Sequence, residues 1–251
     1  MNNPSIAQLP SVSIEKLLLR HDTWRGQPQG FGIQPTVSTG FNELDNNLVN
    51  RGWPLGSLIE ICQPKIQAEW QLFMPALHQL AGLIVLLNPP YTPFCQGLIQ
   101  AGLDLERLVV VATRDKNHFI ACFIELARTS VGAVMAWQPN DNLSYTELRK
   151  LALATTDGTS LCALFRPSVN QQQSSPAALR IFARPLPAVL ELTLFKQKGL
   201  LQTQQIRPLT LPLPDTWQAI LPYPMLNQQS KAHKPDSKPQ HLAGITPRRG
   251  R

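Results

Sequence analysis

The hydrophobic pattern of the chain predicts short apolar strands separated by amphipathic segments. One apolar run spans Leu58 to Cys62, and four more follow it, at residues 83–87, 108–112, 131–137 and 160–165. Near-continuous apolar runs of this length are typical of strands buried on both faces of a parallel sheet. Their alternation with helical segments predicts an α/β fold with a doubly wound parallel sheet, right-handed crossovers and helices on both faces.

The sequence predicts three helices between or before these strands. A turn over residues 37–41 leads into a helix predicted to end near Asn50, and apolar residues at 66, 70, 73, 77 and 80 predict a helix from Ile66 to Leu80. Pro75 falls inside that second helix, where proline removes a backbone hydrogen bond. Ser144 and Glu147 form a capping-box pattern that starts a third helix before the 160–165 strand.

The strand at 58–62 breaks at Gln63-Pro64 before the helical pattern begins, which is the layout of a phosphate-binding P-loop. The residues that bind phosphate and magnesium in such a loop are missing. Where the motif requires Gly, Gly, Lys and Ser or Thr, the chain has Gln63, Ala68, Glu69 and Trp70. A carboxylate would repel the phosphates, and the indole lacks the hydroxyl that holds magnesium. We therefore interpret residues 63–70 as a degenerate P-loop.

Acidic residues are missing at two further positions that ATP hydrolysis needs. The run at 83–87 is followed by Asn88-Pro89-Pro90-Tyr91, and the run at 131–137 has its first acid, Asp141, four residues late. We expect no enzymatic activity and no cofactor, and the scattered histidines suggest no metal site. Tyr91 and Trp137 follow strands at the sheet edge where ligands bind, so they indicate either a partner pocket or ordinary packing.

The pattern changes after Arg166. Residues 179–184 and 189–195 predict a β-hairpin at the edge of the main sheet, because Pro185 and Pro187 lie between them. Arg180 and Arg184 are spaced to share one face, with Lys196 and Lys198 at the end of the next strand. These four residues are candidate contacts for DNA or a protein partner, and a solvated outer face is the alternative.

Composition assigns the basic character to the last third of the chain. The net charge is −2 through Phe165 and +9 from Arg166 onward. Residues 216–251 form a predicted disordered, proline-containing basic tail, which we expect to bind a partner by folding on it. Further candidate contacts for a partner or DNA lie in this tail: Lys231, Lys234, Lys238, Arg248, Arg249 and Arg251.

The cysteines and the apolar runs bear on localisation. Four widely spaced cysteines in apolar surroundings predict buried free thiols and a reducing cytoplasm. Neither a secretion signal nor an apolar run long enough to span a membrane is found. We therefore expect a cytoplasmic protein.

Several short motifs, taken in order, resemble a known family. Val37-Ser38-Thr39-Gly40, Gly52-Trp53-Pro54-Leu55-Gly56 and Ala101-Gly102-Leu103-Asp104 resemble the front of the RecA ATPase core. Three further motifs are similar to the ImuA family of translesion-synthesis-associated RecA-like proteins: Pro89-Pro90-Tyr91-Thr92-Pro93, Phe165-Arg166-Pro167 and Ser175-Pro176-Ala177-Ala178-Leu179-Arg180. The resemblance covers roughly residues 35–215, and residues 98–167 also resemble SulA, the SOS-induced division inhibitor.

The sequence pattern predicts an N-terminal segment at 1–35 that holds a short helix and a Gly/Pro/Gln-rich linker. The ImuA resemblance implies a RecA-like domain over residues 36–215. It implies a non-enzymatic accessory protein of an SOS-induced, error-prone translesion DNA synthesis complex. The implied partners are an ImuB-like Y-family protein and a C-family error-prone polymerase, with RecA as a further contact and direct DNA contact left open. The alternatives are a SulA-like inhibitor of FtsZ and an active RecA-like ATPase.

Overall fold

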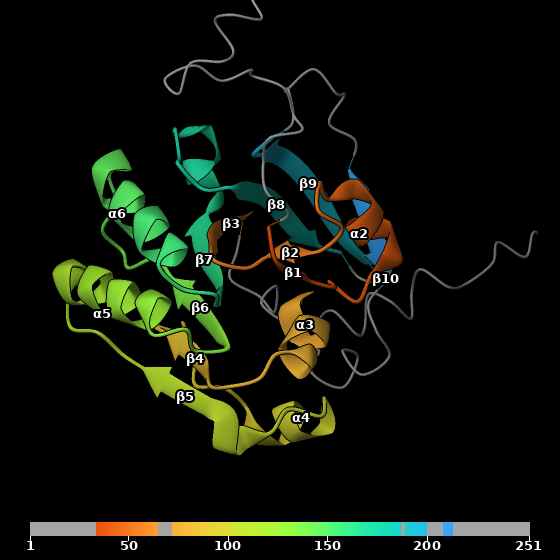
Figure 1. Ribbon diagram of the computed structural model, residues 1–251, viewed down its shortest axis with the longest axis horizontal. Coiled ribbons are helices and arrows are strands. Elements are labelled where there is room, and N and C mark those ends of the chain that lie inside the picture. Colours follow the sequence, from red (N-terminus) through yellow and green to blue (C-terminus); the bar gives the residue numbers. More distant parts are fainter. Residues whose placement is uncertain (1–33, 65–71, 187–188, 200–207, 213–251) are drawn as a thin grey trace, which may run out of the picture.

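A mostly parallel β-sheet organises the fold (Figure 1). The computed structural model of the protein describes residues 34–64, 72–186, 189–199 and 208–212. In spatial order, the eight strands of this sheet are β10 (Leu209–Pro212), β9 (Val189–Gln197), β8 (Leu179–Pro185), β3 (Ser57–Gln63), β7 (Leu161–Pro167), β6 (Ala133–Trp137), β4 (Ile84–Leu87) and β5 (Leu108–Val111). The strands from β8 to β5 are parallel, whereas β8, β9 and β10 pair antiparallel.

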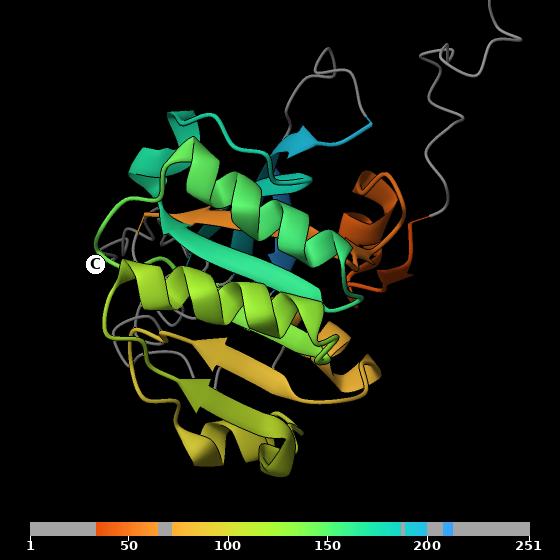
Figure 2. The same ribbon diagram turned by 60° about the vertical axis from the view of Figure 1, so that its left-hand side comes forward.

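Helices cover both faces of the parallel part. One face packs against α2 (Asn42–Asn47), α3 (Met74–Gln79) and α4 (Cys95–Gln100), and the other packs against α5 (Lys116–Arg128) and α6 (Tyr145–Thr156). Figure 2 shows α5 and α6 side by side in front of the sheet. Two 3₁₀ helices, η3 (Leu105–Arg107) and η4 (Ser168–Gln172), precede β5 and follow β7. The chain is therefore a three-layer α/β structure, as its sequence pattern predicts.

A row of aromatic side chains crosses the larger of the two hydrophobic cores. Trp53 contacts Phe73 with ring centroids 4.5 Å apart, and Phe73 meets the edge of Phe165 at 6.0 Å. Phe165 in turn stacks on Trp137 at 4.8 Å. Through Phe73, the residue that precedes α3, this row joins strands β2 (Trp53–Pro54), β7 and β6. Each aromatic pair adds about 0.5–1.5 kcal/mol beyond its buried area.

A small structural unit precedes β3. Strand β1 (Thr36–Val37) pairs antiparallel with β2 (Trp53–Pro54), and the turn between β1 and α2 is held by Asp45. The Asp45 carboxylate accepts hydrogen bonds from the Thr39 amide at 3.0 Å and from the Ser38 hydroxyl at 2.7 Å. These contacts fix the entry of the chain into the sheet.

The structure confirms all five predicted parallel strands but corrects the predicted burial of one of them. The 108–112 strand is not buried on both faces, because β5 is the outer strand of the sheet, and Val109 and Val110 are 36% and 51% exposed. The predicted hairpin is also confirmed as β8 and β9. It is not the edge of the sheet, however, because β10, which we did not predict, pairs with β9.

Two predicted helices are shorter than expected. Helix α3 begins at Met74, so Pro75 lies in its first turn, where the missing N–H costs nothing, and not in the interior of a helix that begins at Ile66. Residues 65–71 lie outside the described part. Helix α2 ends at Asn47 and not near Asn50. The capping box at Ser144 and Glu147 is confirmed, since both reciprocal hydrogen bonds are present.

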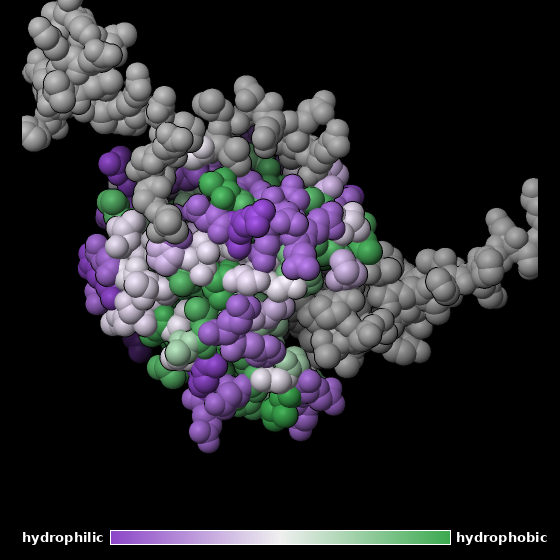
Figure 3. Space-filling model, turned by 45° about the vertical axis from the view of Figure 1, so that its right-hand side comes forward, coloured by the Kyte–Doolittle hydropathy of each residue, from purple (hydrophilic) through white to green (hydrophobic). Residues whose placement is uncertain are grey.

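The surface and the helices give two further observations. On the face shown in Figure 3, apolar residues are scattered among hydrophilic ones. Among the described residues, no helix combines the length and apolar character that crossing a membrane requires.

The capping box at α6 generates a prediction about stability. Substituting Ser144→Ala removes the side chain that accepts from the Glu147 amide. We expect the free energy of unfolding to fall by about 1 kcal/mol in urea denaturation. The control is Thr146→Ala, an exposed residue in the first turn of the same helix, which should be close to neutral. Equal effects of the two substitutions would contradict the assigned role of the cap.

Candidate functional site

The degenerate P-loop begins at the carboxyl end of the central strand β3, which lies between β7 and β8. Gln63 is the last residue of that strand and is 3% exposed. Its side-chain oxygen has no hydrogen-bond partner among the described residues. Pro64 follows it, whereas Ala68, Glu69 and Trp70 lie outside the described part. The structure thus places the start of the predicted loop in the middle of the sheet.

Amide side chains occupy the ends of the two strands, β4 and β6, where nucleotide hydrolysis would need acids. Asn88 follows β4 with a φ of 55°, and it joins the end of β4 to the end of β5 by accepting from the Thr113 amide at 2.6 Å. Gln138 follows β6 and donates to the Asn142 side chain at 3.1 Å. Both residues therefore have structural partners at the carboxyl edge of the sheet.

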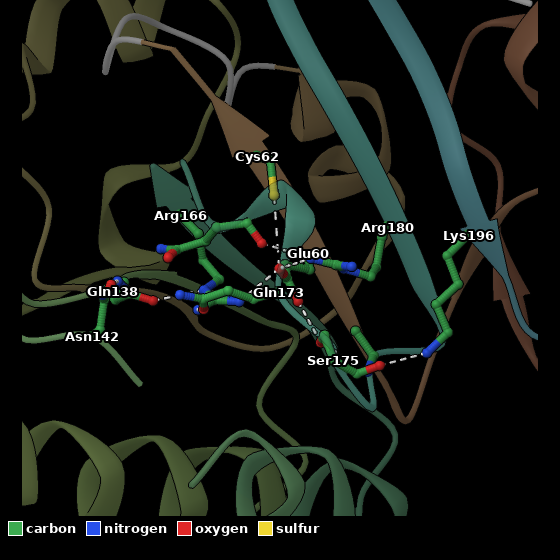
Figure 4. A network of polar contacts seen from close by, with 11 residues as sticks. Glu60, Cys62, Gln138, Asn142, Arg166, Gln173, Ser175, Arg180 and Lys196 are labelled. Carbon is green, nitrogen blue, oxygen red and sulfur yellow. Dashed lines mark hydrogen bonds and ion pairs between the residues drawn. The ribbon is translucent and has the colours of Figure 1, made fainter. Parts of the chain in front are cut away.

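A buried ion cluster, which we did not predict, connects this edge to the hairpin (Figure 4). The Glu60 carboxylate on β3 accepts from Arg166 Nη1 at 2.8 Å and from Arg180 Nη2 at 2.9 Å. Its second oxygen accepts from the Ser175 hydroxyl at 2.5 Å. Glu60 and Arg166 are fully buried and Arg180 is 5% exposed. We call Glu60, Arg166, Arg180 and Ser175 the Glu60 cluster.

Strand register explains why these four residues meet. In the parallel pairing of β3 with β8, Glu60 lies opposite Arg180, so their side chains leave the same face of the sheet. Leu164 lies opposite Glu60 in the pairing with β7, and Arg166 is two residues further along, again on that face. The segment after η4 then brings Ser175 over the carboxylate.

Amide side chains complete the shell around Arg166. Its Nε donates to the Gln138 side-chain oxygen at 2.6 Å, and its Nη2 donates to the Gln173 side-chain oxygen at 3.0 Å. All three nitrogens of this guanidinium are therefore used. Arg180 is less fully satisfied, since it donates to the Asn170 carbonyl oxygen at 3.1 Å while its Nε has no partner among the described residues.

The cluster sets the charge states of the groups around it. Burial by itself would raise the pKa of Glu60, but Arg166, the Ser175 hydroxyl and Arg180 hold it below its ordinary value of 4.5. Burial and the neighbouring Glu60 charge raise the pKa of the Cys62 thiol to about 12. Cys62 is therefore an unreactive thiol at neutral pH.

The structure separates the four basic residues that we predicted as partner or DNA contacts. Arg180 is buried in the Glu60 cluster and is unavailable as a surface contact, which corrects that prediction. Arg184 is half-exposed and pairs with Glu191 at 2.8 Å. Lys196 is half-buried and donates to the Ser175 carbonyl oxygen at 2.6 Å, whereas Lys198 is exposed. The six basic residues predicted in the tail lie outside the described part.

The two aromatic residues predicted at the sheet edge have different environments. Trp137 is 6% exposed and stacks on Phe165, so the packing interpretation is confirmed for it. Tyr91 is 74% exposed. A cavity of about 390 Å³ lies beside Trp137, between the segments that follow β4, β5 and β6, and Asn88, Lys116 and Gln138 are among its lining residues.

The predicted burial of the cysteines is correct for two of them. Cys62 and Cys162 are buried, Cys122 is partly exposed and Cys95 is exposed. Cys95 lies in the first turn of α4, whose buried side is formed by Gly97 and Leu98. The apolar run around Cys95 therefore contributes only one face to the core.

Glu60 and Arg166 gave a signal in the sequence that we did not use. Each is a charged residue within or directly after an apolar run that we predicted as a buried strand. A buried charge requires a partner of opposite sign. The two residues could have been paired on that basis once β3 and β7 were predicted in one sheet.

No protein-family model matches the chain, and no curated protein matches it significantly.

The buried cluster predicts a difference between two arginines. Substituting Arg166→Met leaves the Glu60 charge buried with one fewer partner, so we expect the free energy of unfolding to fall by about 3–5 kcal/mol. The matched control is Arg184→Met, which breaks the half-exposed pair with Glu191 and should cost less than about 1 kcal/mol. Urea denaturation measures both. A loss at Arg166 no larger than that at Arg184 would contradict the assigned role of the cluster.

The pKa of Glu60 predicts the pH dependence of that stability. A carboxyl group whose pKa is lowered by folding stabilises the protein above its ordinary value of 4.5, and this contribution is lost as the pH falls through the folded-state pKa. Glu60→Gln should therefore be less stable than the wild type at neutral pH. The difference should shrink as unfolding is measured at progressively lower pH. A constant difference at every pH would show that ionisation of Glu60 is not involved.

Proposed function

We propose that this chain is a non-enzymatic accessory protein of an SOS-induced translesion DNA synthesis complex, built on a RecA-like domain and of the ImuA type. The resemblance of the ordered motifs over roughly residues 35–215 to ImuA supports this choice of family. In this proposal the chain holds an ImuB-like Y-family protein and a C-family error-prone polymerase together in the cytoplasm, with RecA as a further contact. In this proposal the protein is a scaffold that keeps the fold of a nucleotide-binding domain and lacks the residues that hydrolyse nucleotides.

The observation that carries the proposal is that amide side chains, and not acids, lie at the carboxyl edge of the sheet. The residues that end or follow β3, β4 and β6 are Gln63, Asn88 and Gln138, all with amide side chains. Nucleotide hydrolysis needs acids at such positions to hold magnesium and to orient water. The buried charge at this edge is Arg166, and it is held inside the protein by Glu60 and Gln138.

The Glu60 cluster supports the same proposal by its energetic effect. A P-loop ATPase surrounds the phosphates of its nucleotide with cationic and backbone donors at the end of a central strand. Here a carboxylate on that strand, Glu60, satisfies two guanidinium groups from within the chain. Both guanidinium groups are buried with an anionic partner inside the protein, so neither is placed to bind phosphate, which suits a protein that acts by contact. Tight binding of magnesium–ATP in calorimetry would favour the ATPase alternative instead.

A genetic experiment tests the function. In a strain of the source organism that lacks this gene, we expect fewer ultraviolet-induced mutants, because the polymerase assembly would lose its scaffold. Filamentation after irradiation should remain normal, and a wild-type copy of the gene should restore mutagenesis. Mutation frequency and cell length are measured in the same culture.

The other outcomes of this experiment discriminate between the alternatives. Loss of filamentation with normal mutagenesis would replace the proposal with the SulA-like division inhibitor. No change in either readout would show that the family resemblance does not predict the function of this chain.

A further inference from the structure

The three antiparallel strands at one end of the sheet have one buried face and one open face. Leu190 and Leu192 on β9 and Leu209 and Leu211 on β10 are buried in the larger core. The residues that alternate with them are half-exposed or exposed. Antiparallel strands commonly face solvent on one side in this way. We define the open face by Phe182, Arg184, Glu191, Phe195, Lys196 and Thr210.

A β-bulge in β9 enriches this face in basic and aromatic side chains. The pairing of β8 with β9 is irregular between Arg180 and Ile181, which lie opposite Lys196 and Leu194. Phe195 is the extra residue, and the Arg180 guanidinium lies 4.6 Å from the centre of its ring. Phe195 and Lys196 are therefore both on the side of Arg180. Bulges often redirect side chains in this manner.

The aromatic residues on this face alternate with basic ones. Arg180, Phe182 and Arg184 share one side of β8, and Phe182 and Phe195 are both half-buried, so part of each residue is at the surface. The sequence alone suggested little aromatic interleaving among these charges, because Phe182 and Phe195 are thirteen positions apart and come to the same face only through the pairing of β8 with β9.

The charge of the open face is positive after all internal pairs are subtracted. Arg180 shares the Glu60 carboxylate with Arg166, and Arg184 pairs with Glu191, which is the only acid on the face as defined. Lys196 and the adjacent exposed Lys198 have no carboxylate partner among the described residues. Burial and the neighbouring Arg180 lower the pKa of Lys196. An anionic ligand would complement this surplus.

We propose that the open face binds single-stranded nucleic acid. Phe182 and Phe195 stack on bases. Arg184, Lys196 and Lys198 contact the phosphates that link the stacked nucleotides. Exposed aromatic rings beside basic side chains on a sheet are the physical basis of sequence-tolerant single-strand binding. A peptide strand added to the sheet edge fits less well, because Pro212 at the end of β10 has no N–H to donate. This inference is independent of the proposed function.

The test measures binding of fluorescein-labelled oligo(dT) to the full-length protein by anisotropy over a range of salt concentrations. Phe182→Leu keeps apolar volume and removes the stacking surface, so we expect affinity to fall about 5-fold or more. Its matched control is Phe94→Leu, the same change at a residue 68% exposed beside α4, which should leave affinity unchanged. Oligo(rU) is measured in parallel and should bind similarly, because no contact with a 2′-hydroxyl is proposed.

Charge substitutions give an independent readout. Lys198→Glu should weaken binding and reduce the magnitude of the slope of log affinity against log salt by about 0.7, the value for one phosphate contact on a single strand. The control Lys150→Glu makes the same change at an exposed position on α6 and should have a much smaller effect. Ultraviolet crosslinking to oligo(dT) should label peptides that contain Phe182 or Phe195.

Three results would overturn the proposal. One is that the Phe182→Leu and Phe94→Leu proteins bind equally well. Another is that oligo(dT) crosslinks only to residues 213–251, which would assign binding to the basic tail. The last is that the wild-type protein does not bind oligo(dT) even at low salt. If a variant fails to fold, crosslinking of the wild-type protein still decides the question.

Discussion

Pairing of one carboxylate with two guanidinium groups links the two halves of this sheet through its central strand. Glu60 lies on the central strand, and its partners lie on β7 to one side and β8 to the other. Continuum estimates and mutational data agree that such a buried cluster adds little net stability compared with apolar packing. Leaving one member without its partners is costly, however. We therefore infer that the cluster acts mainly by disfavouring arrangements in which β7 and β8 do not both lie beside β3.

The same cluster connects the edge of the sheet to the segment between η4 and β8. Ser175 and Gln173 from this segment and Gln138 from the end of β6 all bond to it, so separate loops are held at fixed positions. In a nucleotide-binding protein, loops at this edge commonly change position when the ligand binds or leaves. Here internal bonds hold them. A protein that presents fixed loops to several partners would benefit from this arrangement, which agrees with the scaffold that we propose.

Much of the architecture could be predicted because burial on both faces gives a strand a strong sequence signal. The apolar runs that became β3, β4, β6 and β7 show it. The edge strand β5 has the same run of Val and Leu, and periodicity cannot distinguish an outer strand from an inner one. Strand β10 is only four residues long, and its alternating Leu209-Thr210-Leu211-Pro212 is weak evidence when taken alone. The candidate site was harder to predict, because Glu60, Arg166 and Arg180 are far apart in sequence and only strand register brings them together.

The bulge at Phe195 also changes what kinds of mutation the hairpin can tolerate. Side chains alternate along a strand, so the residues at even positions 190, 192 and 194 all point into the core. One extra residue reverses this parity, and Lys196, although also even, lies on the other side with Arg180. A length change of one residue near this point would therefore turn either the lysine inward or the leucines outward. Strand β9 should therefore tolerate substitutions better than insertions or deletions.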